Sequence, residues 1–169
     1  MRYYPIFIDL HGRCVVVVGG GKVAERKVRK LLRAGARVHV ISPDLTAGLA
    51  RLAEQKKIAV TRRPYRKGDL ESRGGAKGLG PLLVYAATND SAVQRAVRED
   101  AAAAGALANR VDTAEDSDFI VPASFTRGDL HVAISTSGTA PALARLLRQQ
   151  LAAGLKKVKG QRAKGKWEK

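Results

Sequence analysis

The chain has 169 residues, of which 45% are hydrophobic, and its formal net charge is +16 at pH 7. This length and apolar content suit one domain of ordinary size with an appended segment. A single cysteine and three histidines exclude a disulfide framework within the chain and a conventional zinc site, so we expect no bound metal. No apolar run is long enough to span a membrane.

The positive charge extends over the whole chain, and it remains strongly positive when the Lys/Gly-rich segment 154–169 is set aside. It favours an anionic partner, either a nucleic acid or an acidic small molecule, unless it is only a solvated basic surface. Aromatic residues are few and do not alternate with basic ones as they do in single-strand binders. We therefore expect no nucleic acid and no membrane as partner. Because the segment MRYYPIFIDL is too short and too polar for a signal peptide, we also expect a cytoplasmic location.

The most informative stretch is a run of four valines, residues 15–18, followed by three glycines. Consecutive β-branched residues predict a strand that is buried on both faces, as in a parallel sheet. Residues 22–34 have helical spacing, and their apolar side is formed by Val23, Val28, Leu31 and Leu32. A strand, a glycine turn and a helix in this order are the context in which a dinucleotide-binding motif is meaningful.

Within this motif, Gly19 is expected to make the turn and Gly21 to let a pyrophosphate approach the backbone. Ala24 takes the third glycine position, where the helix packs closely on the strand. The free N–H groups at Gly21, Lys22 and Val23 would face the phosphates. The alternative is a glycine-rich turn that binds nothing.

Strands and helices alternate through the first 112 residues, which predicts a doubly wound α/β fold with a Rossmann-type parallel sheet. A small α+β dimerisation segment follows. The expected domains are a NAD-binding domain over 1–113, a dimerisation and active-site segment over 114–153, and a basic, disordered tail over 154–169. Further strands are expected over 36–41, 58–62, 82–87, 107–111, 119–122 and 130–135. Further helices are expected over 45–55, 91–104 and from near 139 to 151. Between them, a helical turn is expected over 67–73 and a flexible loop over 74–81. Tyr3, Tyr4, Pro5, Ile6 and Phe7 are expected to pack on the edge of the first strand.

Ligands of open α/β sheets lie beyond the carboxyl ends of the strands. The acid that binds the ribose normally ends the second strand, whereas this chain has Ser42 there and Asp44 two residues later. No arginine follows that strand to take a 2′-phosphate, so NAD is favoured over NADP. The candidate cofactor-binding residues are Gly19, Gly21, Lys22, Val23, Ser42, Pro43, Asp44, Thr88 and Asn89.

Two further polar groups can carry chemistry. Asp112 ends the fifth strand at the cofactor edge, where it is either a proton acceptor for a substrate or the cap of a turn. Residues 135–139 offer hydroxyls and amides at a helix start, which suits either a carboxylate or an N-cap. The candidate substrate-binding residues are Asn109, Ser135, Thr136 and Ser137.

Three stretches resemble one family: GGGKVAERK, AATND and STSGTAPALARLLR. They lie in unbroken order within residues 1 to about 153, and they are similar to the precorrin-2 dehydrogenase modules of sirohaem synthases. The resemblance implies NAD-dependent oxidation of precorrin-2, an anionic tetrapyrrole, to sirohydrochlorin. Some members also act as a ferrochelatase (a lyase), inserting ferrous iron into the product.

The same resemblance implies roles for individual residues. NAD contacts fall on Lys22 and Val23 and on Pro43 and Asp44, and the catalytic aspartate falls on Asp112. Thr136 matches a hydroxyl residue of the active-site region, and residues 118–151 match the segment through which the family forms homodimers. The alternative function is a non-catalytic, NAD-sensing regulatory domain, which would share the first 112 residues but would not need the STSGTAP segment.

Overall fold

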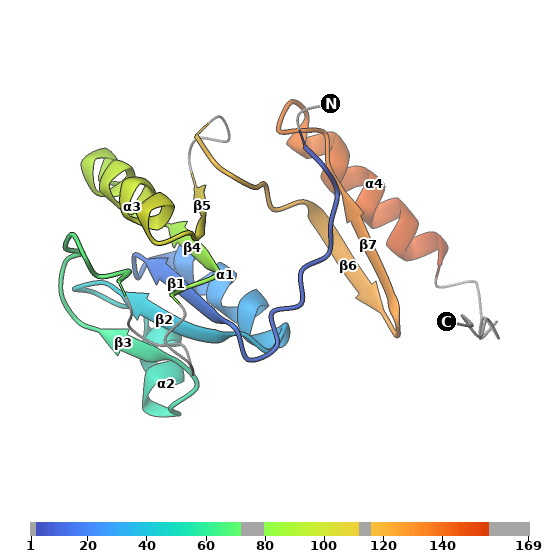
Figure 1. The fold of residues 1–169 in the computed structure, drawn as a ribbon. Coiled ribbons are helices and arrows are strands. Elements are labelled where there is room, and N and C mark those ends of the chain that lie inside the picture. The colour runs from blue at the N-terminus through green and yellow to red at the C-terminus, as the bar shows by residue number, and fades with distance from the viewer. Residues whose placement is uncertain (1–2, 72–79, 112–115, 156–169) are drawn as a thin grey trace, which may run out of the picture. The chain divides into compact units, whose positions relative to one another are not determined.

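The valine-rich strand lies in the middle of a five-stranded parallel sheet. The structure, a computed structural model, describes residues 3–71, 80–111 and 116–155 (Figure 1). The chain divides into two units, Met1–Phe119 and Ile120–Lys169. The domain boundary predicted after residue 113, the loop over 74–79 and the tail from 156 onward lie outside the described residues.

The sheet of the first unit has the strand order β3-β2-β1-β4-β5, so the order reverses between β1 and β4. The elements of this unit are β1 (Cys14–Val18), α1 (Lys22–Arg33), β2 (Arg37–Ile41), α2 (Ala47–Glu54), β3 (Ala59–Thr61), β4 (Leu83–Ala86), α3 (Ser91–Ala103) and β5 (Leu107–Arg110). All four strand pairs are parallel, which confirms the predicted α/β class.

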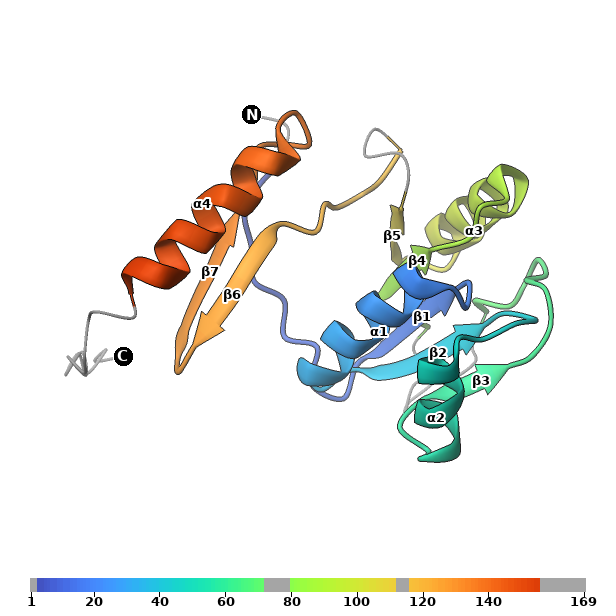
Figure 2. The same ribbon diagram turned by 180° about the vertical axis from the view of Figure 1, so that it is seen from behind.

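The two faces of the sheet carry separate apolar clusters. Val15 and Val17 of β1 pack with α1 and α2, whereas Val16 and Val18 pack with α3 (Figures 1 and 2). Alternate side chains of a strand point to opposite faces, so a run of four valines supplies both clusters at once. Cys14 is buried in the second cluster, and this burial raises the pKa of its thiol.

The second unit contains an antiparallel pair, β6 (Ala123–Arg127) and β7 (Leu130–Ile134), and the helix α4 (Pro141–Gly154). Pro141 stands at the start of α4, where its missing N–H removes no hydrogen bond. The hairpin turns at Gly128, whose φ of +54° is in the left-handed region. This unit confirms the expected α+β composition of the second segment.

One predicted strand is wrong. The strand expected over 119–122 is absent, because the chain contacts β5 through Asp118, whose amide donates to the Ala108 oxygen (2.9 Å) and whose carboxylate accepts from the Ala108 amide (2.8 Å). The hairpin pairing begins only at Ala123. Within the helical turn expected over 67–73, a hydrogen-bonded turn is present at residues 67–70, and residues 72–73 lie outside the described part of the chain.

The N-terminal aromatic residues do not pack on an edge of β1. This strand pairs with β2 on one side and β4 on the other, so it has no free edge. Tyr4 and Phe7 are therefore largely exposed, at 82% and 74%. Val23, expected on the apolar side of α1, is also exposed, and Ala24 is buried in its place.

Candidate functional site

The start of α1 differs from the starts of the next two helices. The Thr46 side chain accepts from the Leu49 amide at the start of α2, and the Asp90 side chain accepts from two amides at the start of α3. The first residue before α1 is Gly21, which has no side chain to do the same. The N–H groups of the first turn of α1 are thus available to an anionic ligand, which the helix dipole also favours.

The three glycines make room for this start in different ways. Gly19 has a φ of +119°, and a Cβ there would lie 2.2 Å from the Ala87 carbonyl oxygen. A Cβ on Gly20 would lie 1.9 Å from the Asp44 carbonyl oxygen. At Gly21, by contrast, a Cβ would meet nothing within 4 Å, so the space in front of α1 is open. Gly19 and Gly20 thus allow neighbouring backbone segments to approach closely, whereas Gly21 leaves open space in which a pyrophosphate would fit.

The loop after β2 is tied to α1 by a carboxylate. Glu25 accepts a hydrogen bond from the Thr46 hydroxyl (2.6 Å) and pairs with Arg29 (2.7 Å). These two bonds, the first above all, hold the pKa of Glu25 below its usual value. Ser42 is buried and donates to the Asp44 oxygen (2.8 Å), whereas the Asp44 side chain is exposed. The loop therefore presents Pro43 and Asp44 to solvent beside the glycine turn.

The end of β4 turns sharply into α3. The Thr88 hydroxyl accepts from the Asp90 amide (3.2 Å), and the Thr88 carbonyl accepts from the Gln94 side chain (2.6 Å). Asn89 is exposed at this turn. The two predicted cofactor residues thus lie at the carboxyl edge of the sheet, on the other side of the β1–β4 reversal from Ser42.

A compact cluster lies over the ends of β4 and β5. Asn109, 7% exposed, accepts from the Lys27 ammonium (3.1 Å) and donates to the Phe119 oxygen (2.9 Å). The same ammonium lies 4.5 Å from the centre of the Tyr85 ring, and that ring meets Phe119 edge-on at 5.4 Å. Asn109, a predicted substrate contact, is thus bonded through both its amide oxygen and its amide nitrogen.

Burial changes the acidity of this cluster. It lowers the pKa of Lys27 to about 8, with smaller contributions from the neighbouring charges of Arg26 and Lys30. It also raises the pKa of Tyr85 to about 12. Both groups therefore keep their protons at neutral pH.

Arg110, the last residue of β5, bonds to residues on the far side of the loop that follows this strand. Its guanidinium donates to Gln94 (3.1 Å) and pairs with Asp116, and its amide donates to the Ser117 hydroxyl (2.9 Å). Asp112, the predicted base, lies between these anchors but outside the described residues.

In the second unit, the three predicted hydroxyl residues precede α4. Ser135 accepts from the Ser137 amide (3.0 Å), and Thr136 accepts from the Ala140 amide (3.2 Å). Ser137 has a positive φ of 56°. The N-cap residue of α4 is Ala140, whose side chain cannot cap the helix, so these hydroxyls stabilise the preceding turn instead of acting as the expected N-cap. Ser137 and Thr139 remain exposed.

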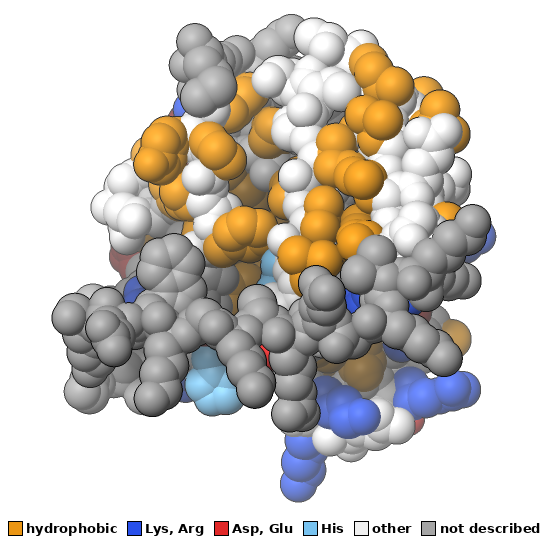
Figure 3. Space-filling model, turned by 90° about the vertical axis from the view of Figure 1, so that its right-hand side faces the viewer, with side chains coloured by type: hydrophobic (Ala, Val, Ile, Leu, Met, Phe, Trp, Pro, Cys, Tyr) orange, Lys and Arg blue, Asp and Glu red, His pale blue; other side chains and the backbone are white. Residues whose placement is uncertain are grey.

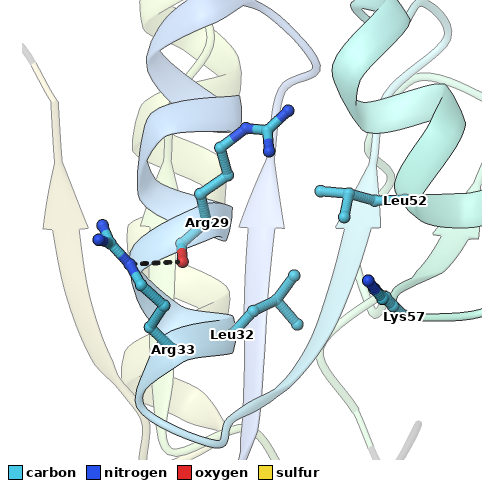
Figure 4. A pocket seen from close by; sticks show the side chains of 5 residues that line it. All are labelled: Arg29, Leu32, Arg33, Leu52 and Lys57. Carbon is cyan, nitrogen blue, oxygen red and sulfur yellow. Dashed lines mark hydrogen bonds between the residues drawn. The ribbon is translucent and has the colours of Figure 1, made fainter.

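The described residues also form an open basic hollow between α1 and α2, lined by Arg29, Leu32, Arg33, Leu52 and Lys57 (Figure 4). Arg33 donates to the Arg29 carbonyl oxygen (3.3 Å) at its rim. Leu32 follows Lys22 by ten residues, or about 15 Å along the helix, so this hollow is not the glycine site.

Within the described ranges, no three His, Cys, Asp or Glu side chains lie close enough to hold a metal ion. None of the helices in the described part of the chain is both long and apolar enough to cross a membrane.

A parallel sheet whose order reverses beside a glycine turn and an open helix start defines a dinucleotide-binding protein of the Rossmann type. Comparison with known proteins agrees. Residues 6–123 match the NAD(P)-binding family NAD_binding_7, and residues 127–153 match the central segment of sirohaem biosynthesis proteins.

Two similar proteins are named siroheme synthase. The one from Nitrosomonas europaea is 42% identical over 154 residues, which are 90% of this chain and 31% of that protein. The one from Chromobacterium violaceum is 44% identical over 152 residues, which are 89% of this chain and 30% of that protein. This chain thus spans about a third of the length of such relatives.

A solved structure named "SirC, precorrin-2 dehydrogenase" matches with a TM-score of 0.74 and 31% identity, over 90% of this chain and 71% of that one. The chain belongs to the precorrin-2 dehydrogenase and siroheme synthase family, as the sequence resemblance predicted.

Sequence reasoning did not find the Glu25–Thr46 and Lys27–Asn109 contacts. An acidic residue in the first turn of a helix and a threonine before the next helix are weak signals for the first contact. A lysine next to the apolar side of α1 is the only signal for the second, because the sequence does not show which strand lies beneath it.

Proposed function

We propose that this chain oxidises precorrin-2 to sirohydrochlorin with NAD⁺ as the oxidant. The observation that supports this most strongly is the open, uncapped start of α1 in a chain similar to a precorrin-2 dehydrogenase over most of its length. When bound, NAD⁺ accepts a hydride from a ring carbon of the substrate. The reaction is balanced if a base takes up the proton lost with that hydride.

The residues divide this work. The backbone N–H groups from Gly21 to Val23 would hold the pyrophosphate, and the loop with Pro43 and Asp44, braced by Glu25, would flank the adenosine half. Thr88 and Asn89 would border the nicotinamide side. Asp112, two residues after the Arg110 anchor, would act as the base, because a carboxylate can accept the proton.

The same proposal includes a homodimer and a cytoplasmic location. Four leucines of α4 are largely exposed along the helix, which supports a homodimer that covers them: Leu143, Leu146, Leu147 and Leu151. Thr136 and its neighbours would then take part in the active-site region, as in the family. A single, buried, unpaired cysteine is consistent with a reducing cytoplasm.

The test is an anaerobic assay with precorrin-2 and NAD⁺, which follows NADH absorbance and the sirohydrochlorin spectrum together. The proposal requires both signals to rise in equal amounts. If NAD⁺ binds and no NADH forms, the chain is a regulatory NAD sensor instead. Ferrous iron added after oxidation shows whether the chain also accepts iron as a substrate, by comparing the rate of sirohaem formation with the uncatalysed rate.

A further inference from the structure

Opposite sides of helix α1 contact different parts of the first unit: one side faces β2 and α2, and the other faces β4 and β5. Glu25 and Lys27 are two residues apart, so their side chains leave the helix about 200° apart. Glu25 contacts Thr46 on the side of β2 and α2. Lys27 contacts Tyr85 of β4 and Asn109 of β5.

The Lys27 ammonium is held in place by neutral groups. It donates to the Asn109 oxygen at 3.1 Å and lies 4.5 Å from the centre of the Tyr85 ring. Both partners are fixed by Phe119, through a hydrogen bond to Asn109 and an edge-on contact with Tyr85. The ammonium therefore has a defined position at the ends of two strands.

Among the described residues, this cluster lacks an anion. An ammonium has three N–H donors, and among the described residues only Asn109 accepts one of them, while no carboxylate lies within ion-pair distance. A partly buried cation without a negative partner is unfavourable, and the lowered pKa of Lys27 is the expected consequence. The nearest charges on its own helix, Arg26 and Lys30, are also positive.

The position of Lys27 favours the reacting half of the site. Tyr85 and Asn109 are each the last residue but one of their strands, and both strands lie beyond the β1–β4 reversal, away from the loop with Asp44. Along the helix, Lys27 lies about 7.5 Å from Lys22, at the turn after the one that would face the pyrophosphate. A carboxylate of the substrate, rather than a phosphate of the cofactor, fits this place.

We propose that Lys27 is a substrate-binding residue, whose remaining N–H donors bind a carboxylate of the tetrapyrrole while Asn109 and Tyr85 hold the ammonium in place. This inference rests on the proposed function, since that function supplies the substrate. The paired ammonium and carboxylate would form a charge-assisted hydrogen bond in a poorly solvated place, where such bonds are strong.

The test measures equilibrium binding of sirohydrochlorin, by its own fluorescence, to the wild type and to Lys27→Met, Lys27→Arg and Lys30→Met. Methionine keeps the length of the side chain and removes its charge. Lys30→Met is the matched control, because it removes an exposed charge of the same helix. We expect Lys27→Met to weaken sirohydrochlorin binding at least about tenfold, Lys30→Met less than about threefold, and NAD⁺ affinity to change less than about twofold in both.

Three further readouts separate this role from a structural one. The melting temperature of Lys27→Met should stay close to that of the wild type, because removing a poorly solvated charge offsets the lost hydrogen bond to Asn109. Raising the salt concentration should weaken sirohydrochlorin binding more in the wild type than in Lys27→Met. Lys27→Arg, which keeps the charge, should retain more of the affinity than Lys27→Met.

Unchanged sirohydrochlorin affinity in folded Lys27→Met would overturn the inference, as would an equal loss in Lys27→Arg and Lys27→Met. A loss of NAD⁺ affinity alone would assign Lys27 to the cofactor and also overturn it. Because the readout is binding, it is independent of turnover. A wild type that binds sirohydrochlorin through Lys27 but forms no NADH would overturn the proposed function and leave the substrate-carboxylate role of Lys27 supported.

Discussion

The two units of the chain bury their apolar side chains very differently. In the first unit, two clusters on opposite faces of the sheet contain nearly all the fully buried residues. In the second unit, Ala144 is the only buried hydrophobic residue among those described, and the leucines of α4 remain exposed. Figure 3 shows hydrophobic side chains gathered at the surface on one face of the molecule.

A two-stranded hairpin with one helix has too little core to be stable by itself. We therefore expect the first unit to bind the cofactor without help and the second to need another surface that covers its helix. We therefore expect substitutions in the first unit to change stability and NAD⁺ binding, and substitutions in the second unit to change the oligomeric state.

The largest effect is expected from Gly20→Ala, which attacks the first unit. Its Cβ would lie 1.9 Å from the Asp44 carbonyl oxygen, so backbone must move. We expect the free energy of unfolding to fall by about 3 kcal/mol or more. We also expect the variant to lose NAD⁺ binding. The control is Gly21→Ala, where the space is open and φ is −79°, and which should change stability by less than about 1 kcal/mol. Chemical denaturation of both variants checks this, and equal stabilities would refute the close approach at Gly20.

The next effect concerns the chemistry and leaves both units folded. Asp112→Asn keeps the shape of the side chain and removes its ability to accept a proton. We expect oxidation of precorrin-2 to slow at least about a hundredfold, with normal NAD⁺ affinity and melting temperature. A decrease of only a few-fold in the single-turnover rate would reduce Asp112 to the cap of a turn.

The second unit is tested by Leu146→Glu. Leu146 is 49% exposed on α4, so a charge there is tolerated in a monomer but not inside a dimer interface. We expect sedimentation to change from about twice 18.1 kDa to 18.1 kDa, with the first unit still able to bind NAD⁺. Arg145→Glu places the same negative side chain about 100° around the helix from Leu146 and should leave the dimer intact. A dimer that survives Leu146→Glu would mean that another surface joins the two copies.

The smallest effect is on the pH dependence of stability. Burial lowers the pKa of Lys27 to about 8 in the folded chain, from 10.5 when it is exposed. Between these values the unfolded chain binds more protons, so this group makes the folded state more stable as the pH rises through this window. We expect the stability of the wild type, relative to Lys27→Met, to increase by about 2 kcal/mol from pH 8 to pH 10. Taking the difference cancels the contribution of the buried tyrosines, and a flat difference would mean that Lys27 is well solvated.

Local sequence determined most of the first unit. Four valines that feed both faces of a sheet, a glycine turn, and an amphipathic helix of matching length need no distant partner, so β1, α1 and β2 could be predicted closely. The same holds for the positions of Ser42, Asp44, Thr88 and Asn89, because the ends of parallel strands meet at one edge.

Only the tertiary structure decided which distant residues meet. Lys27 and Asn109 are 82 positions apart, and nothing in either segment indicates the other. The strand expected over 119–122 is absent because the preceding Asp118 bonds to β5 and Phe119 packs on Tyr85 of β4. Tyr4 and Phe7 are exposed because the strand they were expected to flank lies in the centre of the sheet. Periodicity within a segment reports how that segment meets an apolar surface, whereas the order of strands and the side chains between them depend on how all segments pack together.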